Sequence, residues 1–154
     1  MIESAPRVAF FTDSFHEVNG VALTSRQLEG FARRRRYPFF SAHTGQETRV
    51  WQEESVTRCE LALSGSSFAL ETDLRFDLRF LRHRASVVEA LRRFQPDLVH
   101  VTGPSHVGIL GVIAARVERS LFALVPLGAD DWQAARTAYA EFALERLPAE
   151  GVAA

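Results

Sequence analysis

The stretch RVAFFTDSFHEVNGVALTSRQLEGFARR at residues 7–34 decides the fold. Residues 8–11 form a continuous apolar run, which is typical of a strand covered on both faces. Short polar side chains follow, and Asn19-Gly20 predicts a turn. Apolar residues then recur at the spacing of one helix face: Val21, Leu28, Phe31 and Ala32. The stretch predicts a buried strand, a tight loop and an amphipathic helix. Ligands of open α/β sheets bind at the carboxyl ends of strands, and helix N-termini attract phosphate, so this loop is a candidate site for an anionic ligand.

Strand and helix patterns alternate along the rest of the chain. Strands are expected at 39–42, 98–101 and 121–125, weak strand signals lie at 56–63, and helices are expected at 87–94, 107–118 and from 130 to 148. Residues 46–72 are otherwise less regular, and residues 74–81 fit a strand and a helix equally well. The alternation predicts one α/β domain over residues 1–154, with a doubly wound, mainly parallel sheet and helices on both faces.

Composition narrows the class of protein. The 154 residues are 47% hydrophobic, and the formal net charge of −1 gives no bulk attraction to nucleic acid. Cys59 is the one cysteine, which excludes an internal disulfide and suits a reducing compartment. No apolar run is long enough to span a bilayer, and the first residues lack the apolar core of a signal peptide. We therefore expect a cytoplasmic protein.

Two motifs resemble those of a known enzyme family. FTDSF at residues 11–15 precedes VNGV at 18–21, and PDLVHVTGPSHVGILG spans residues 96–111. Together they resemble the N-terminal half of GT-B-type retaining glycosyltransferases of family 4. RYPFFSAHTG at 36–45 and FDLRFLRH at 76–83 are similar to one bacterial branch of that family. The resemblance extends from residue 7 to about residue 119.

The resemblance implies a Rossmann-like half of a GT-B fold. It implies the N-terminal, acceptor-side domain of an enzyme, or a truncated form of it, with the C-terminal donor domain absent. The family transfers a hexosyl group from a nucleotide sugar to a hydroxyl of a carbohydrate or lipid acceptor, with retention and without a required metal or other cofactor. Because half a cleft positions neither substrate fully, we expect the chain to be inactive alone. The implied partners are a separate C-terminal domain or a second copy, and, through lipid acceptors, the inner membrane surface.

The resemblance and the strand ends together select the substrate-binding candidates. These are Asp13, Ser14, Phe15, Asn19, Gly20, Thr102, Ser105 and His106; no catalytic residue is assigned. Asp13 either binds a sugar hydroxyl or caps its loop. Gly20 either lets a phosphate approach the backbone, which the resemblance favours, or provides a positive φ.

The histidines separate by position. His106 follows a strand, where a polar side chain would face the cleft and contact substrate, whereas His100 lies inside the strand and is expected in the core. His16 is expected on a surface loop. The five histidines and Cys59 show no metal-ligand spacing, so no metal is expected. The arginines at 33–36 either touch anionic lipid or complete a helix C-terminus, and we favour the second interpretation.

The chain also departs from the family. SLFALVPLGADD at 120–131 places Gly128 where relatives carry a histidine beside the reacting sugar. This departure makes catalysis by the chain alone less expected. A second hypothesis is a non-catalytic binding or interaction domain that keeps the fold. A third hypothesis is an unrelated flavodoxin-like or Rossmann-like nucleotide binder. The absence of a GxGxxG motif after the first strand argues against it.

Overall fold

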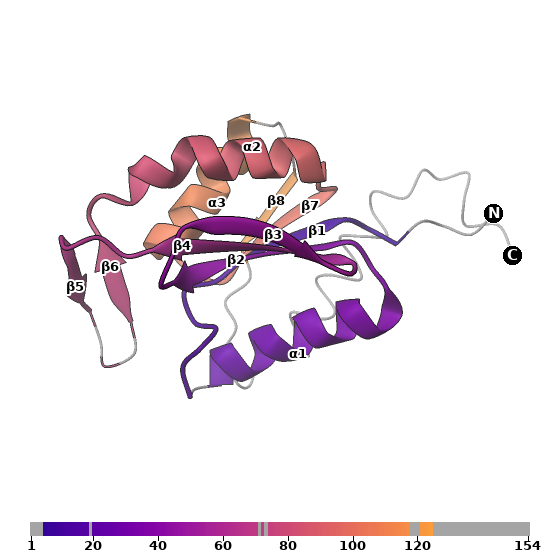
Figure 1. Cartoon of the computed structure of the whole chain (residues 1–154), viewed down its shortest axis with the longest axis horizontal. Coiled ribbons are helices and arrows are strands. Elements are labelled where there is room, and N and C mark those ends of the chain that lie inside the picture. The colour runs from indigo at the N-terminus through magenta and orange to yellow at the C-terminus, as the bar shows by residue number, and fades with distance from the viewer. Residues whose placement is uncertain (1–4, 19, 71, 73, 118–120, 125–154) are drawn as a thin grey trace, which may run out of the picture.

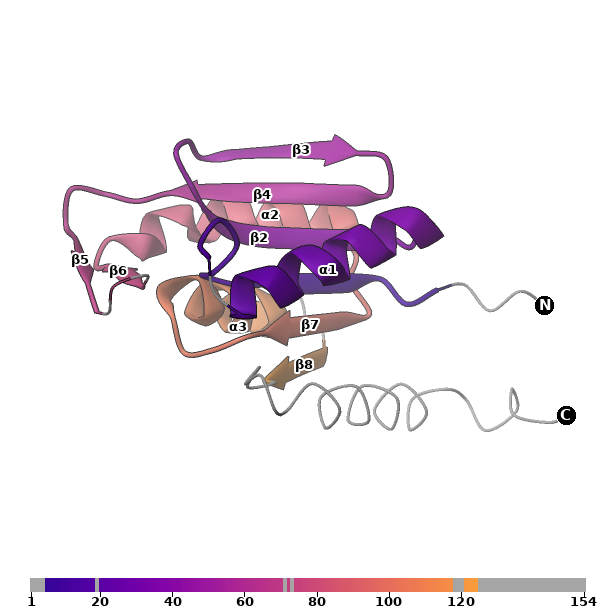
Figure 2. The ribbon, with the colours of Figure 1, turned by 90° about the horizontal axis from the view of Figure 1, so that it is seen from below.

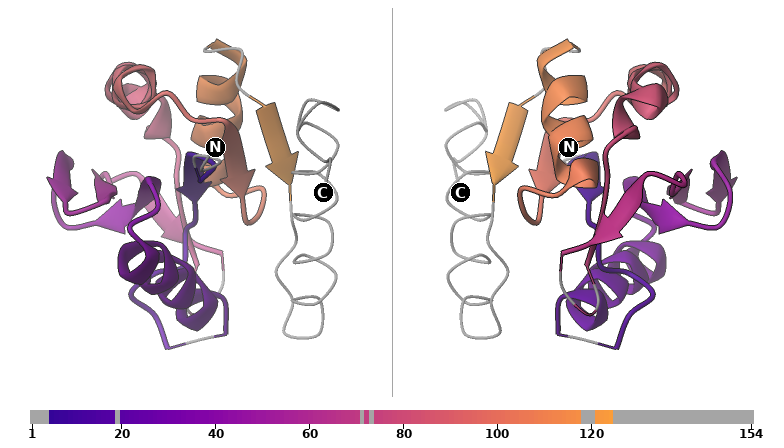
Figure 3. Two further views of the ribbon diagram at one scale, coloured as in Figure 1. Left: turned by 90° about the vertical axis from the view of Figure 1, so that its right-hand side faces the viewer. Right: turned by 90° about the vertical axis from the view of Figure 1, so that its left-hand side faces the viewer.

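The computed structural model describes residues 5–18, 20–70, 72, 74–117 and 121–124. Over these residues the chain is an α/β protein whose main sheet carries helix α1 on one face and helices α2 and α3 on the other (Figure 1). Figure 3 shows the same two faces from the ends of the molecule. The predictions for Asn19, for Gly128 and for a helix from residue 130 lie outside the described residues.

The main sheet has six strands in the described part of the chain, in the order β3-β4-β2-β1-β7-β8 (Figure 2). Their bounds are β1 Val8–Phe11, β2 Phe39–Gly45, β3 Arg49–Glu53, β4 Val56–Ala62, β7 Leu98–Val101 and β8 Leu121–Leu124. Strand β3 at the edge is antiparallel to β4, and every other neighbouring pair is parallel. A separate hairpin consists of β5 (Ser67–Ala69) and β6 (Arg75–Asp77).

The helices are α1 (Gly20–Arg35), α2 (Arg84–Phe94) and α3 (His106–Val117), with a 3-10 helix η1 (Phe80–His83) before α2. Helix α2 ends at Phe94, and its C-cap Gln95 has a left-handed backbone with φ of 55° and directly precedes Pro96. The Arg7 side chain satisfies the last carbonyls of α2, donating from Nε to Phe94 at 2.8 Å and to Gln95 at 3.1 Å. The expected strand-loop-helix order of the first unit is confirmed.

The sheet buries two apolar clusters, one on each face. Because neighbouring strand residues point to opposite faces, Phe10 and Phe39 pack with α1, whereas Phe11 and Phe40 pack under α2 and α3. The larger cluster takes Val87, Leu91 and Phe94 from α2 and Val107, Leu110 and Ala114 from α3. This alternation explains why the apolar runs of β1 and β2 are continuous.

Three expectations about secondary structure need correction. Residues 46–72 include the strand β3, whose Val50 and Gln52 are exposed and give no apolar pattern. The prediction for β2 was too short, because β2 pairs with β4 along its whole length to Gly45. Residues 74–81 are neither one strand nor one helix: β6 ends at Asp77, and η1 begins at Phe80 after a two-residue turn.

Helix α3 approaches the sheet through two glycines. A Cβ placed on Gly108 would lie 2.0 Å from the carbonyl oxygen of Gly103 and 2.8 Å from Val101 Cγ1. A Cβ on Gly111 would lie 2.7 Å from the ring of Phe11. The missing side chains therefore allow the helix backbone to reach the strand and the loop before it.

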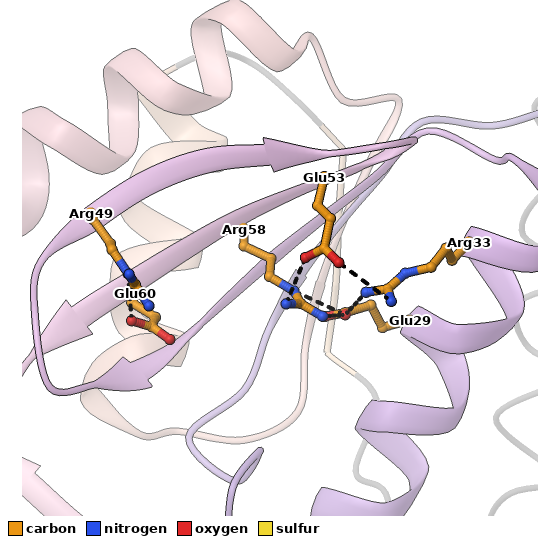
Figure 4. A network of polar contacts seen from close by, with 6 residues as sticks. All are labelled: Glu29, Arg33, Arg49, Glu53, Arg58 and Glu60. Carbon is orange, nitrogen blue, oxygen red and sulfur yellow. Dashed lines mark hydrogen bonds and ion pairs between the residues drawn. The ribbon is translucent and has the colours of Figure 1, made fainter.

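Helix α1 is joined to the outer strands by an ionic network around the buried Glu29 (Figure 4). Glu29 of α1 is 3% exposed, and its Oε1 accepts hydrogen bonds from Arg58 on β4 and from Arg33 at 3.2 Å. Glu53 of β3 completes the network with Arg58 at 2.9 Å. Arg33, Arg34 and Arg35 form the last turn of α1, the position that the favoured interpretation gives them, and Arg36 follows the helix.

None of the helices in the described ranges has both the length and the apolar character that crossing a membrane requires.

Candidate functional site

The loops after β1 and β7 leave the sheet side by side at its carboxyl edge. The two strands are parallel neighbours, with Phe11 opposite Val101. The backbone N–H of Thr102 donates to the carbonyl of Phe11 at 3.1 Å, which continues the pairing beyond the strands. The structure thus brings residues 13–15 and 102–106 to one edge, although they are far apart in the sequence.

Asp13 lies half-buried in the β1–α1 loop. The loop is closed by Thr12, whose Oγ1 accepts from the Ser14 N–H at 3.3 Å and donates to the Ser14 carbonyl at 3.1 Å. The Asp13 carboxylate makes no hydrogen bond or ion pair with another described residue. Its predicted alternative role as the cap of the loop is therefore wrong, because the carboxylate takes no part in closing the loop.

Phe15 and Gly20 differ in what they offer a ligand. Phe15 is 9% exposed and stacks on the ring of His43 with centroids 4.3 Å apart, so its side chain packs inward. Gly20 is exposed and is the first residue of α1. No described glycine has a positive φ, so the interpretation that Gly20 provides one is wrong. A Cβ at Gly20 would meet nothing within 4 Å, which leaves its backbone open to solvent.

Thr102 and Ser105 are held by local hydrogen bonds. Thr102 Oγ1 donates to the Phe11 carbonyl at 3.4 Å, and Ser105 Oγ accepts from the Gly108 N–H at 3.0 Å. Ser105 directly precedes α3 and is its N-cap. Both hydroxyls thus have structural partners, and their contribution to a site is first of all to fix the β7–α3 loop.

His106 is the first residue of α3 and is 2% exposed. The ring centroids of Phe76 and Phe80 lie 5.6 Å and 6.4 Å from that of His106, and these rings cover it. The expectation that His106 faces the cleft is therefore wrong. Burial lowers the pKa of His106, while the charges of Asp77 and Asp13 act in the opposite direction. Its Nδ1 is buried without a hydrogen-bond partner among the described residues.

The hairpin that covers His106 is anchored by Asp77. This carboxylate is 1% exposed and accepts hydrogen bonds from Ser64 N–H, from Arg79 N–H and from Arg82, each at 2.9 Å. Burial alone would raise the pKa of Asp77, but the hydrogen bonds from Ser64 and Arg79 outweigh it and hold the pKa well below its usual value. Asp77 therefore stays ionised and fixes β6 beside α3.

Sequence reasoning missed a second group of polar side chains at the same edge. His16, His43 and Glu60 each place one potential ligand atom within 4.8 Å of the others. His16 is exposed on the β1–α1 loop, as expected, but His43 and Glu60 face each other on neighbouring strands. The proximity of His43 and Glu60 follows from the pairing of β2 with β4, so the sequence could have indicated it only if the register of these strands were known.

No model of a known protein family matches this chain, and no curated protein matches it either. The geometry of the carboxyl edge and the two motifs therefore carry the functional argument.

Because several histidines are buried, we expect the free energy of unfolding to fall in acid. Burial lowers the pKa of His43, His83 and His106, and lowers that of His100, which lies in the core as expected, from 6.5 to about 4. A histidine whose pKa is lower in the folded state stabilises the fold fully above pH 6.5, and this contribution is lost as the pH falls. We expect the protonation of His100 alone to lower the free energy of unfolding by about 3 kcal/mol at pH 4.

Urea unfolding of the chain between pH 8 and pH 4.5 measures this effect. The free energy of unfolding should decline with pH in the wild-type chain and decline less steeply in His100→Leu, whatever the difference between the two at pH 8. Equal slopes for the two proteins would contradict the assignment to His100.

Proposed function

We propose that this chain is the acceptor-side domain of a retaining glycosyltransferase, with a doubly wound, Rossmann-like fold. The proposed reaction passes a hexosyl group from a nucleotide sugar to a hydroxyl of a carbohydrate or lipid acceptor. The observation that carries the proposal is the meeting of the two motif loops, 11–21 and 96–111, at the carboxyl edge of the sheet. That edge is where open α/β sheets bind their ligands.

Two groups are the proposed ligand contacts at this edge. The Asp13 carboxylate, which has no described hydrogen-bond or ion-pair partner, would accept a hydrogen bond from a sugar hydroxyl. The exposed backbone at Gly20, where α1 begins, would lie against a phosphate. The remaining candidates, Phe15, Thr102 and Ser105, support these loops from behind through the contacts described above.

A second domain would close the cleft and hold most of the nucleotide. Exposed apolar side chains next to the carboxyl edge are the surface that such a domain or a second copy would cover: Phe68, Leu70, Leu78 and Leu81. We expect no sugar transfer by this domain alone, because positioning of both substrates supplies much of the rate. A non-catalytic binding domain is the alternative, favoured by the burial of His106 away from solvent.

Titration of uridine- and guanosine-diphosphate sugars into isotope-labelled chain tests the proposal. We expect weak binding with amide shifts at residues 13–15 and around Gly20, because one wall of a cleft buries little of a ligand. Gly20→Val should weaken this binding about tenfold or more, since the added side chain blocks the approach to the backbone. The fold should persist, because a Cβ at Gly20 meets no neighbour within 4 Å.

Gly65→Val is the matched control. Gly65 is also exposed, has no positive φ, and a Cβ there likewise meets nothing within 4 Å. Binding should be unchanged in Gly65→Val. Shifts confined to the opposite edge of the sheet, or equal affinities for the Gly20 variant and the wild-type chain, would refute the proposed site.

A further inference from the structure

His16, His43 and Glu60 form a cluster of metal-ligand type at the carboxyl edge. One nitrogen of each imidazole and one oxygen of the carboxylate lie within 4.8 Å of one another. Two imidazoles and a carboxylate are the donor set of catalytic zinc sites with three protein ligands and one open position. The cluster is independent of the motif loops' proposed sugar contacts, Asp13 and Gly20.

The sheet register fixes two of the three residues. His43 of β2 is directly opposite Glu60 of β4 in a parallel pair, so the two side chains project from the same face. Glu60 is in turn opposite Arg49 of β3. This is the face that carries α1, because alternate residues of the same strands pack against that helix.

The third residue comes from the β1–α1 loop that folds over His43. His16 follows Phe15, whose ring is stacked on His43 with an interplanar angle of 5°, and the His16 ring meets His43 edge-on with centroids 5.0 Å apart. Arg26 of α1 donates hydrogen bonds to the carbonyls of Phe15 and Glu17, which hold the loop in this place.

His43 is prepared as a ligand by its own hydrogen bond. Its Nδ1 lies 3.0 Å from the Thr44 carbonyl, which can only accept, so Nδ1 carries the proton and Nε2 keeps its lone pair. The side chain is 1% exposed, and Nε2 has no hydrogen-bond partner among the described residues. A buried lone pair without a partner is costly, and a bound cation would satisfy it. A carbonyl on the second ring nitrogen is also the usual outer partner of a metal-bound histidine.

Glu60 offers one oxygen while the other is held. Its Oε2 accepts from Arg49 Nε at 3.0 Å, a pair that Figure 4 shows apart from the network around Arg58. Oε1 remains for a cation, and Arg49 would act as the outer partner that orients the carboxylate. The nearby Gly45 keeps this space open, since a Cβ there would lie 2.8 Å from Glu60 Cδ.

The cluster opens into a hollow of about 530 Å³, which provides an entry path and room for a further ligand. His16 and Glu60 line it together with Gly45, Glu47 and Arg49. Zinc ligands at about 2.0–2.1 Å from the metal lie about 3.3 Å from one another, so the cluster must contract slightly on binding. His16, exposed on its loop, can make that movement.

We propose that His16, His43 and Glu60 bind a divalent transition-metal ion of the Zn²⁺ class, with an open coordination position toward the hollow. A water molecule or an anionic oxygen of a ligand would take that position.

Calorimetric titration of the metal-free chain with Zn²⁺ tests the site. We expect one tight equivalent and a Zn²⁺-dependent rise of Tm, because the cation binds the folded state alone. His16→Gln and Glu60→Gln should each weaken binding about a hundredfold, the upper end of what losing even an outer partner costs. Glu47→Gln removes an exposed acid from the same hollow and should leave the affinity unchanged.

Imidazole nitrogen spectra provide a readout that does not depend on affinity. Zn²⁺ should shift the ring nitrogens of His16 and His43 and leave those of His100, in the core of β7, unmoved. His16 is exposed, so its substitution is not expected to unfold the chain. Absence of Zn²⁺ binding, or binding that persists unchanged in both His16→Gln and Glu60→Gln, would overturn the proposal.

Discussion

We expect a Gly108→Ala substitution to lower the free energy of unfolding by about 3 kcal/mol, the upper end of what overpacking costs. The new Cβ would lie 2.0 Å from the carbonyl oxygen of Gly103, which is a backbone atom and cannot rotate away as a side chain can. Either α3 must lift from the sheet or the loop before it must move, and both break the Ser105 cap on the Gly108 N–H. Urea unfolding followed by circular dichroism measures the loss.

Gly30→Ala in α1 is the matched control, because it is the same exchange inside another helix. A Cβ at Gly30 would meet only the Nη1 end of Arg34 at 3.3 Å, and that flexible side chain can give way. Since alanine is the better helix former by about 1 kcal/mol, Gly30→Ala should stabilise the chain. Equal effects of the two substitutions would contradict the close approach of α3.

The second large effect is expected from Arg58→Met, which should cost about 3 kcal/mol of stability. Arg58 binds the Glu29 carboxylate, whose side chain is 4% exposed and whose Oε2 is buried without a hydrogen-bond partner among the described residues. Removing the guanidinium leaves that charge buried with Arg33 as its remaining described partner, at 3.2 Å. Methionine keeps much of the apolar stem, so the loss reports the charge rather than the packing.

A double substitution separates the two contributions. Replacing both Glu29 and Arg58 with methionine removes the stranded charge, and this variant should recover most of the stability lost in Arg58→Met. Glu89→Gln, which breaks an exposed pair with Arg93 at 2.9 Å, should change stability by less than about 1 kcal/mol. A double variant no more stable than Arg58→Met would show that the network is not the cause.

The sequence predicted those parts of the fold whose pattern reflects burial. The runs at 8–11 and 98–101 are covered on both faces, so their apolar residues correctly predicted the strands β1 and β7. Strand β3 escaped notice because it forms by pairing with β4 at the sheet edge, through a turn in which Glu54 has φ of 56°. The spacing of Leu78 and Leu81 could not identify the structure of residues 74–81. Both side chains are exposed, so their spacing does not mark a buried face.

The candidate site was predictable in position but not in detail. That the loops after β1 and β7 would meet follows from parallel pairing, and the structure brings them together. That His106 would be covered by Phe76 depends on a hairpin whose docking no local pattern encodes. The same holds for His43 and Glu60, since their proximity is a property of strand register and not of spacing.

The arginines at the helix ends have a consequence for the molecule as a charged body. Each α-helix that the structure describes has arginine in its last turn, and these helices run back from the carboxyl edge to where the next strand begins. Arg7, just before β1, lies at that same end. Helix C-termini carry partial negative charge, so these arginines offset the partial charge that the three helix dipoles would otherwise gather at one end of the sheet.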